Sequence, residues 1–201
     1  MPPEKGKQPP MFKRKKFLKD LIALPGLSGY EKPVREMLQE TWKQYADELE
    51  ISPLGSLHGL VYGNGEEPRR RVLLASHMDA IGLMVTQIES GFLRIMEIGG
   101  LDDRVLPGQQ VIVHGREPIE GVIIQPPSFL LPKGDGNGVV AQEYLLVDTG
   151  LMPDELEKKV RIGDLVSFAQ PPLDLGKHIL AGHSLDNRAS VAVLTECLVE
   201  L

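Results

Sequence analysis

The sequence predicts an α/β protein that is interrupted by a strand-rich insert. Two helical patterns come first, within residues 12–45, and an apolar run, VLLASH at 72–77, has the pattern of a buried parallel strand. Between about residues 81 and 172, six short apolar runs follow one another with Gly, Pro and Asp turns between them. The chain then returns to a helical pattern, so the insert divides the α/β part in two.

The first two predicted elements are helices that pack on a sheet. Apolar residues recur at helical spacing from Phe12 to Leu24, and Pro25-Gly26 ends the pattern. The second helix opens at Ser28-Gly29 and has Pro33 in its first turn, where proline is tolerated. Its apolar stripe consists of Val34, Met37, Leu38, Thr41, Trp42 and Tyr45. A short strand, LHGLVYG at 57–63, follows.

The insert predicts a small antiparallel barrel or sandwich. Its strand-like runs are IGLMVTQIE, GFLRIMEIGG, QQVIVHG, PIEGVIIQ, EYLLVDTG and GDLVSFAQ. A loop is expected at 126–138, and PDELEKKV at 153–160 predicts a short helix with acidic residues in its first turn. After the insert we expect a strand and a tight polar turn at 177–188, then an apolar helix at 189–201.

These elements predict four segments. A disordered basic tail is expected at 1–16, a first part of the α/β domain at 17–80, the β-rich insert at 81–173 and a second part of the α/β domain at 174–201. The last helix stays apolar to its end without a Gly, Pro or polar cap. We therefore expect the core of this domain to continue beyond the given chain.

Composition and charge exclude several classes of protein. Hydrophobic residues make up 42% and charged residues 25%, as in soluble globular proteins. Residues 1–20 carry seven of the 22 basic and two of the 28 acidic residues, which leaves 15 against 26, a net charge of −11, for the rest. Such an acidic body argues against nucleic acid as the main partner. The basic run at 12–20 could contact nucleic acid or an anionic surface, but we prefer a frayed tail that leads into a solvated helix face.

Two further features of the sequence predict the cellular compartment of the protein. The single Cys197 cannot form an internal disulfide, so nothing indicates an oxidising compartment. No run approaches the roughly 20 apolar residues of a membrane helix, and the start of the chain has no apolar leader. We therefore expect a cytoplasmic protein with no membrane partner.

Three polar residues lie where predicted strands give way to loops: His77, Asp79 and Asp186. Residues i and i+2 of an extended chain project to the same side, so His77 can bind a metal while Asp79 orients its imidazole. Asp186, in the turn SLDNR, has two carboxylate oxygens with which it could bridge two metals. Each has a plainer interpretation. His77 could be an ordinary hydrogen-bonded residue at a strand end, and Asp186 a helix N-cap.

Five motifs together resemble the tetrahedral (TET) aminopeptidase family, which includes the glutamyl aminopeptidases. They are LIALPGLSGYEKPVREML (21–38), HMDAIGLMV (77–85), GFLRIMEIGGLDDRVLPGQQVIVHG (91–115), VRIGDLVSF (160–168) and GHSLDNR (182–188). They occur in the family's order, and the resemblance covers residues 17–201. It extends over the N-terminal portion of the family's sequence only.

The resemblance implies a Zn-peptidase-like α/β catalytic domain, incomplete here, with an inserted β-barrel-like dimerisation domain. Residues 17–80 and 174–201 would be the two catalytic parts and 81–173 the dimerisation domain. It also implies that His77 binds one metal, that Asp79 supports the site as a catalytic residue, and that Asp186 bridges two metal ions, zinc or cobalt. The peptide bond after Asp186 is implied to be cis. The family's Glu-Glu pair, further Asp and late His have no counterpart in these residues.

Two motifs depart from the family pattern. Ala80 stands where the family has an acidic residue, and Ser52 with Gly55-Ser56 replaces a D-x-x-G-N turn. Neither change removes a metal ligand. His183, three residues before Asp186, is a weaker candidate for the same site.

Three functions follow as hypotheses. The first is an aminopeptidase that removes N-terminal residues from peptides within a homo-oligomer, which is a dimer or a dodecamer built from dimers. The second is a natural short protein that is not catalytic and acts through its dimerisation domain. The third is a divergent homologue with another amide or acyl substrate. Because His77 and Asp186 are two ligands, one fewer than a catalytic zinc site normally has, we expect the chain alone to be inactive.

Overall fold

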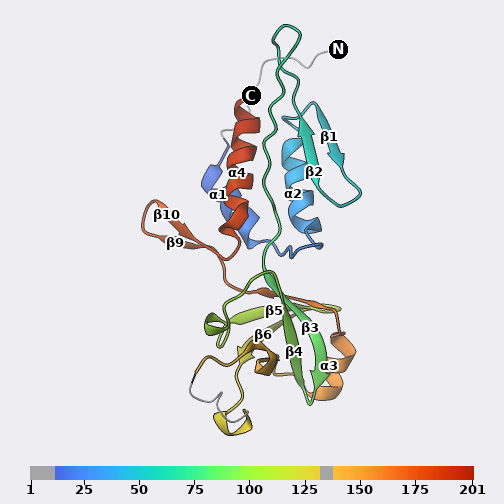
Figure 1. Cartoon of the computed structure of the whole chain (residues 1–201), viewed down its shortest axis with the longest axis vertical. Coiled ribbons are helices and arrows are strands. Elements are labelled where there is room, and N and C mark those ends of the chain that lie inside the picture. The colour runs from blue at the N-terminus through green and yellow to red at the C-terminus, as the bar shows by residue number, and fades with distance from the viewer. Residues whose placement is uncertain (1–11, 132–137) are drawn as a thin grey trace.

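A computed structural model describes residues 12–131 and 138–201. Figure 1 shows the chain as two parts, a helical half and a barrel below it. The linking segments are the long trace that precedes β3 and the segment that follows the barrel, which carries the β9–β10 hairpin. No helix among these residues is long and apolar enough to cross a membrane.

Three helices form the first part: α1 (Arg14–Ala23), α2 (Lys32–Trp42) and α4 (Leu185–Glu200). The predicted stripe of α2 is confirmed, since Val34, Leu38 and Trp42 are buried. The indole N–H of Trp42 donates to Thr195 Oγ1 at 2.9 Å, which joins α2 to α4. The core of this half consists of Phe17, Leu21, Val34, Leu38, Trp42, Val191 and Leu198.

The predicted tail was partly wrong. Residues 14–16 belong to α1, and residues 1–11 lie outside the described part of the chain. The basic residues of α1 form ion pairs with acidic residues of this chain. Lys15 and Lys19 both contact Asp174 in the β9–β10 hairpin, at 2.6 and 2.5 Å, and Arg14 pairs with Glu196 of α4. These ion pairs neutralise most of the positive charge on this face of α1.

Two antiparallel hairpins accompany the helices. β1 (Glu48–Ile51) pairs with β2 (Leu57–Leu60), and β9 (Leu173–Leu175) pairs with β10 (Ile179–Ala181). β2 and β10 lie within runs that we predicted as strands. β1 and β9 were not predicted, because each is short and mostly exposed and so lacks a clear apolar alternation.

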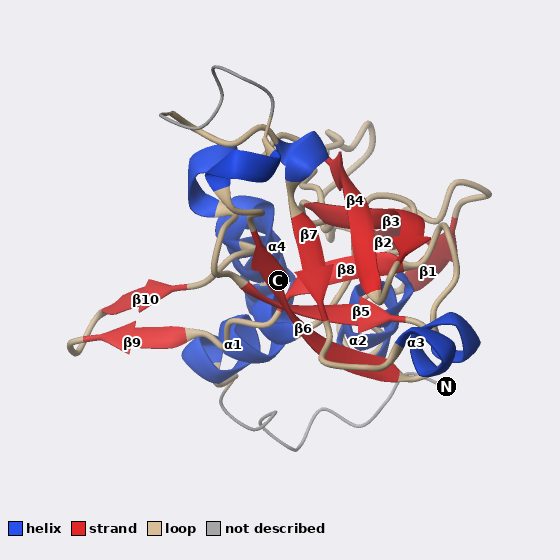
Figure 2. Cartoon of the chain, turned by 90° about the horizontal axis from the view of Figure 1, so that it is seen from below, coloured by secondary structure: helices blue, strands red, loops and turns tan. Residues whose placement is uncertain are grey.

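The insert is a closed antiparallel barrel, with neighbours in the order β3-β4-β7-β6-β5-β8 (Figure 2). Its strands are β3 (Gly82–Glu89), β4 (Phe92–Ile98), β5 (Gln110–His114), β6 (Pro118–Ile124), β7 (Leu146–Asp148) and β8 (Leu165–Phe168). All six predicted strands are confirmed, and the barrel alternative is the one observed. β6 shows why these predictions succeed. Its residues alternate between exposed and buried, as they must in a strand that has one face in a core.

The segments that connect the barrel strands can also be compared with the sequence prediction. The predicted short helix is α3 (Pro153–Lys159), which buries Leu156. Single 3-10 turns lie at Asp103–Val105, Ser128–Leu130 and Gln142–Tyr144. The second of these falls in the expected loop at 126–138, of which residues 132–137 are outside the described part.

The prediction of a buried strand at 72–77 was wrong. Val72 and Leu73 are 82% and 89% exposed, and these residues belong to no strand. An apolar run becomes a buried strand only where other strands pair with it, and none of the described residues does so here. The one parallel bridge nearby joins Leu27 to Ala80. The α/β domain therefore stays a prediction, while the barrel is observed.

Candidate metal centre

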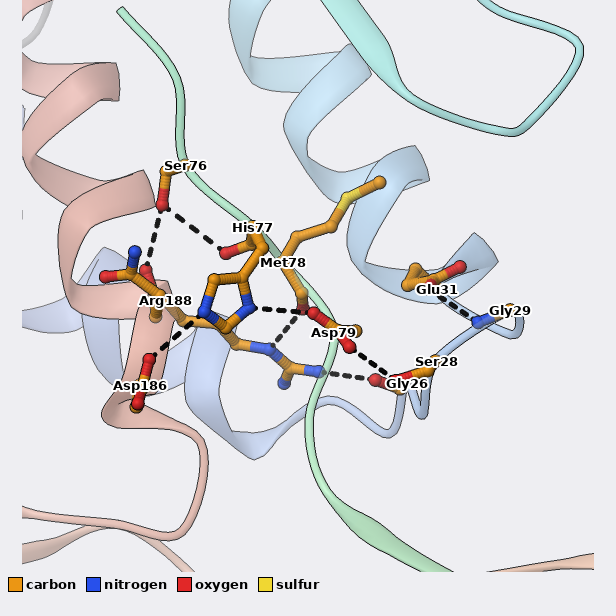
Figure 3. A network of polar contacts seen from close by, with 11 residues as sticks. Gly26, Ser28, Gly29, Glu31, Ser76, His77, Met78, Asp79, Asp186 and Arg188 are labelled. Carbon is orange, nitrogen blue, oxygen red and sulfur yellow. Dashed lines mark hydrogen bonds and ion pairs between the residues drawn. The ribbon is translucent and has the colours of Figure 1, made fainter. Parts of the chain in front are cut away.

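The three predicted site residues lie together where the segment that leads into β3 passes the start of α4 (Figure 3). His77 Nδ1 is 2.7 Å from Asp79 Oδ1, and His77 Nε2 is 3.1 Å from Asp186 Oδ1. His77 and Asp79 belong to the extended segment that leads into β3, whereas Asp186 lies at the start of α4. Folding thus brings Asp186 to the H-x-D pair across more than a hundred residues.

Hydrogen bonding to Asp79 orients the His77 imidazole. An ionised carboxylate only accepts, so His77 Nδ1–H donates its hydrogen bond to Asp79, while Nε2 faces Asp186 Oδ1. The other oxygen of Asp79 accepts from the Ser28 hydroxyl. This hydrogen bond lowers the pKa of Asp79, His77 acts in the same direction, and partial burial opposes both. Asp79 is therefore ionised at neutral pH and holds His77 as a metal ligand is usually held.

Asp186 is directed at His77 and is 94% exposed at its side chain. It has non-helical backbone angles, φ −88° and ψ 107°, and its peptide bond to Asn187 is cis, as the resemblance implies. The first turn of α4 has no side-chain cap at Ser184. The hydroxyl of Ser76 donates to the Asn187 carbonyl at 3.2 Å, which ties the H-x-D segment to this turn.

Arg188 is the residue that sequence reasoning missed. It is fully buried, and burial lowers its pKa to about 10 even though nearby Asp79 acts in the opposite direction. Its guanidinium donates to the carbonyl oxygens of Leu21, Leu24, Gly26 and Met78. We call this set of bonds the Arg188 clamp. The sequence contained one sign of this role, an arginine at the start of an otherwise apolar helix, two residues after Asp186.

The clamp joins three segments that surround the site. Leu21 and Leu24 are at the end of α1, Gly26 is in the α1–α2 loop, and Met78 lies between His77 and Asp79. A Cβ on Gly26 would stand 2.9 Å from Arg188 Nη2 and 2.9 Å from Val34 Cγ2. Glycine is therefore needed here for the close approach of the chain to the guanidinium.

The donor set meets some of the requirements of a divalent metal ion. An imidazole nitrogen and a carboxylate facing each other suit zinc or cobalt, and Asp79 supplies the outer partner that a ligating histidine needs. Within residues 12–131 and 138–201, however, no three His, Cys, Asp or Glu side chains are grouped so that they could hold a metal. The residues present fit part of a metal centre.

The weaker candidate, His183, lies elsewhere. Its Nδ1 is 2.6 Å from Ser184 Oγ, and its ring lies 6.5 Å from that of Phe168 in β8. Together with His114 it lines a cavity of about 290 Å³ between the end of α1 and the barrel. Burial lowers the pKa of both histidines, and Arg188 contributes to the effect on His183.

The two departures from the family pattern have structural roles. Ala80 is buried, and its N–H donates to the Gly26 carbonyl at 2.8 Å. Ser52 closes the β1–β2 turn, where its hydroxyl accepts from the Ser56 N–H at 3.1 Å. The same turn borders a cavity of about 250 Å³ between α2 and α4, which His77 and Asp79 also line.

Comparison with known proteins adds sequence and structural relatives. Residues 55–201 match the family model described as M42 glutamyl aminopeptidase. The lysyl aminopeptidase of Pyrococcus furiosus is 31% identical over 191 residues, which cover 92% of this chain and 54% of that protein.

Two solved structures share the fold. The TET aminopeptidase of a marine sediment archaeon, Thaumarchaeota archaeon SCGC AB-539-E09, matches with a TM-score of 0.85 and 30% identity, over 94% of this chain and 54% of that chain. The TET1 peptidase of Pyrococcus horikoshii, described as assembling into a tetrahedron or a large octahedral shell, matches with a TM-score of 0.80 and 32% identity, over 94% and 56% of the two chains. The chain spans about half the length of the curated relatives it matches. Because the family model matches well over half of its residues, this chain belongs to the M42 glutamyl aminopeptidase family.

Proposed function

We propose that this chain carries one part of the active site of a metal-dependent aminopeptidase, which removes N-terminal residues from peptides. The observation that carries the proposal is the arrangement of His77, with Nδ1 bound by Asp79 and Nε2 facing Asp186. In this proposal His77 is a ligand of one ion, Asp186 bridges two ions, and Asp79 holds the imidazole in place. Two bound ions, zinc or cobalt, would supply a water of lowered pKa and polarise the scissile carbonyl.

The remaining ligands and the general base are proposed to come from polypeptide outside these residues. His77 and Asp186 supply two donors, whereas a catalytic zinc ion normally has three protein ligands. The relatives are about twice as long as the matched region. The exposed apolar side chains at 72–74 support the same view, because further strands could pair there and cover them.

The barrel is proposed to be the dimerisation domain of a homo-oligomer. Support comes from relatives of the same fold, one of which is described as a tetrahedral or octahedral assembly. We also propose that the protein is cytoplasmic and acts on peptides, in keeping with an acidic body that disfavours nucleic acid.

Metal titration tests the site directly. On addition of Zn²⁺ or Co²⁺ to the 201-residue chain, we expect the NMR signals of the His77 ring to shift, with weak affinity because only two ligands are present. His77→Ala and Asp186→Ala should abolish this response, whereas His58→Ala, an exposed residue of β2, should leave it unchanged. A response that survives Asp186→Ala would contradict the bridging role.

Activity and mass separate the aminopeptidase from the short, non-catalytic protein. We expect no hydrolysis of an unblocked peptide by residues 1–201 alone, and hydrolysis that is lost on His77→Ala would overturn this expectation. The intact mass of the native protein decides between the two hypotheses. A mass well above 22.2 kDa favours the aminopeptidase, and a mass near 22.2 kDa favours a role through the barrel.

A further inference from the structure

The Ser28 hydroxyl is part of the polar network at the metal centre, although it lies in the loop between α1 and α2. It donates to Asp79 Oδ2, and it provides the largest single contribution to the low pKa of that carboxyl group. Ser28 itself is exposed, and Asp79 keeps 33% of its side chain exposed. The bond therefore adds little to the apolar core, and its effect falls on the orientation of Asp79.

Orientation matters because the two carboxylate oxygens have different partners. Oδ1 accepts from His77 Nδ1–H and Oδ2 accepts from Ser28, so the carboxylate is held from both sides. Without Ser28, the terminal torsion of an aspartate is broad and the group can rotate away from the imidazole. A free carboxylate would also bind water as readily as His77.

The loop that presents Ser28 is itself firmly held. The Gly26 carbonyl accepts from Ala80 N–H at 2.8 Å and from Arg188 Nη2 at 3.3 Å, and Leu27 forms a parallel bridge with Ala80. The backbone on both sides of Asp79 is thereby fixed relative to Ser28, through the Arg188 bond to Met78 and the bridge at Ala80. Ser28 thus stands on a rigid support that is independent of His77.

From these contacts we infer that Ser28 is a positioning residue, whose hydroxyl orients Asp79 so that Asp79 Oδ1 holds the His77 ring at Nδ1 and directs Nε2 toward the metal site. The inference rests on the proposed metal site for its purpose, but the hydrogen-bonding relay from Ser28 through Asp79 to His77 can be measured without metal. Within the described part of the chain, the Ser28 hydroxyl forms its hydrogen bond with Asp79 and none with His77 or Asp186, so we expect it to act on the site through Asp79.

The test uses the full 201-residue chain and the ¹⁵N shifts of the His77 ring, recorded at the same pH for every variant. In the unmodified protein we expect His77 to be protonated on Nδ1. Ser28→Ala should move the two ring nitrogens toward averaged shifts, because Asp79 no longer selects one tautomer, and Ser28→Thr should restore the original shifts. Ser128→Ala, which removes the hydroxyl of an exposed serine in the barrel region, is the matched control and should change nothing at His77.

Metal binding provides the second readout. Ser28→Ala should weaken Zn²⁺ binding about tenfold, the lower end of the effect of removing an outer partner of a ligating histidine. Thermal unfolding should be unchanged, which separates positioning from a structural role.

The outcomes distinguish the two proposals. Unaltered His77 ring shifts in Ser28→Ala would overturn the positioning role, whatever the metal titration gives. Altered shifts in Ser28→Ala, with no response of His77 to Zn²⁺ or Co²⁺ in any variant, would uphold the relay and refute the metal site.

Discussion

The barrel and the helical half are held together in different ways. Each barrel strand has a hydrogen-bonded neighbour on both sides, and the strands enclose an apolar core. In the helical half, the segment that carries His77 is unpaired for most of its length, and Val72 and Leu73 are exposed. There the Arg188 clamp joins α1, the α1–α2 loop and the H-x-D segment to α4. Many equivalent contacts stabilise the barrel, whereas the site depends on a few polar contacts around one buried charge.

Loss of the clamp should have the largest effect. Arg188→Leu leaves buried carbonyls without donors, and we expect it to lower the free energy of unfolding of the helical half by roughly 3–5 kcal/mol. Urea unfolding followed by the fluorescence of Trp42, the single tryptophan, measures this directly. Arg104→Leu, at an exposed arginine of the barrel, should cost less than about 0.5 kcal/mol. Equal effects of the two variants would refute the special role of Arg188.

A cavity in the barrel should come next. Leu93 is fully buried in β4, so Leu93→Ala should cost about 3 kcal/mol, as large-to-small changes in cores do. We expect faster hydrogen exchange in the barrel amides with little change in the Trp42 transition. Val122→Ala, on a partly exposed side chain of β6, is the matched control. A Trp42 transition that shifts as much as the barrel amides would show that the two parts unfold as one unit.

The junction between the two parts should respond to pH. Burial lowers the folded-state pKa of His114 and His183 below that of the unfolded chain, so the unfolded state binds more protons as the pH falls below about 6.5. Stability should be full above that pH and decrease below it, by at most about 1.4 kcal/mol per pH unit for each histidine. Unfolding measured between pH 7.5 and 5 tests this, and His114→Gln should reduce the slope. A slope that is unchanged in this variant would assign the pH dependence to other groups.

The smallest effect is expected at the unpaired segment. Leu73→Asp should change the free energy of unfolding by less than about 0.5 kcal/mol, because the side chain is already in water. It should also reduce self-association of the chain in sedimentation experiments, since exposed apolar segments without strand partners promote aggregation. A loss comparable to that of Leu93→Ala would mean that Leu73 is buried in solution, and the contrast between the two halves would fail.

Part of the site could be predicted from local sequence. The spacing of His77 and Asp79 by two residues already placed both side chains on one side of an extended chain, and their 2.7 Å contact agrees with this. The proximity of Asp186 could not be obtained from spacing. Its place at a predicted strand end made it a candidate, and the resemblance to a family assigned it to the same site as His77. Arg188 was missed because a charged residue at a helix start is usually exposed, and its burial depends on four carbonyls from three other segments.

The sequence by itself determined the secondary structure that depends on short-range pattern. The barrel strands and the helices α1, α2 and α3 follow from apolar periodicity, turn residues and the positions of proline and glycine. Tertiary structure alone decided the closure of the barrel, the meeting of His77 with Asp186, the burial of Arg188 and the exposure of the apolar run at 72–74. The physical reason is that burial and pairing are properties of what surrounds a residue, so the same apolar run becomes a core strand or an exposed segment according to its neighbours.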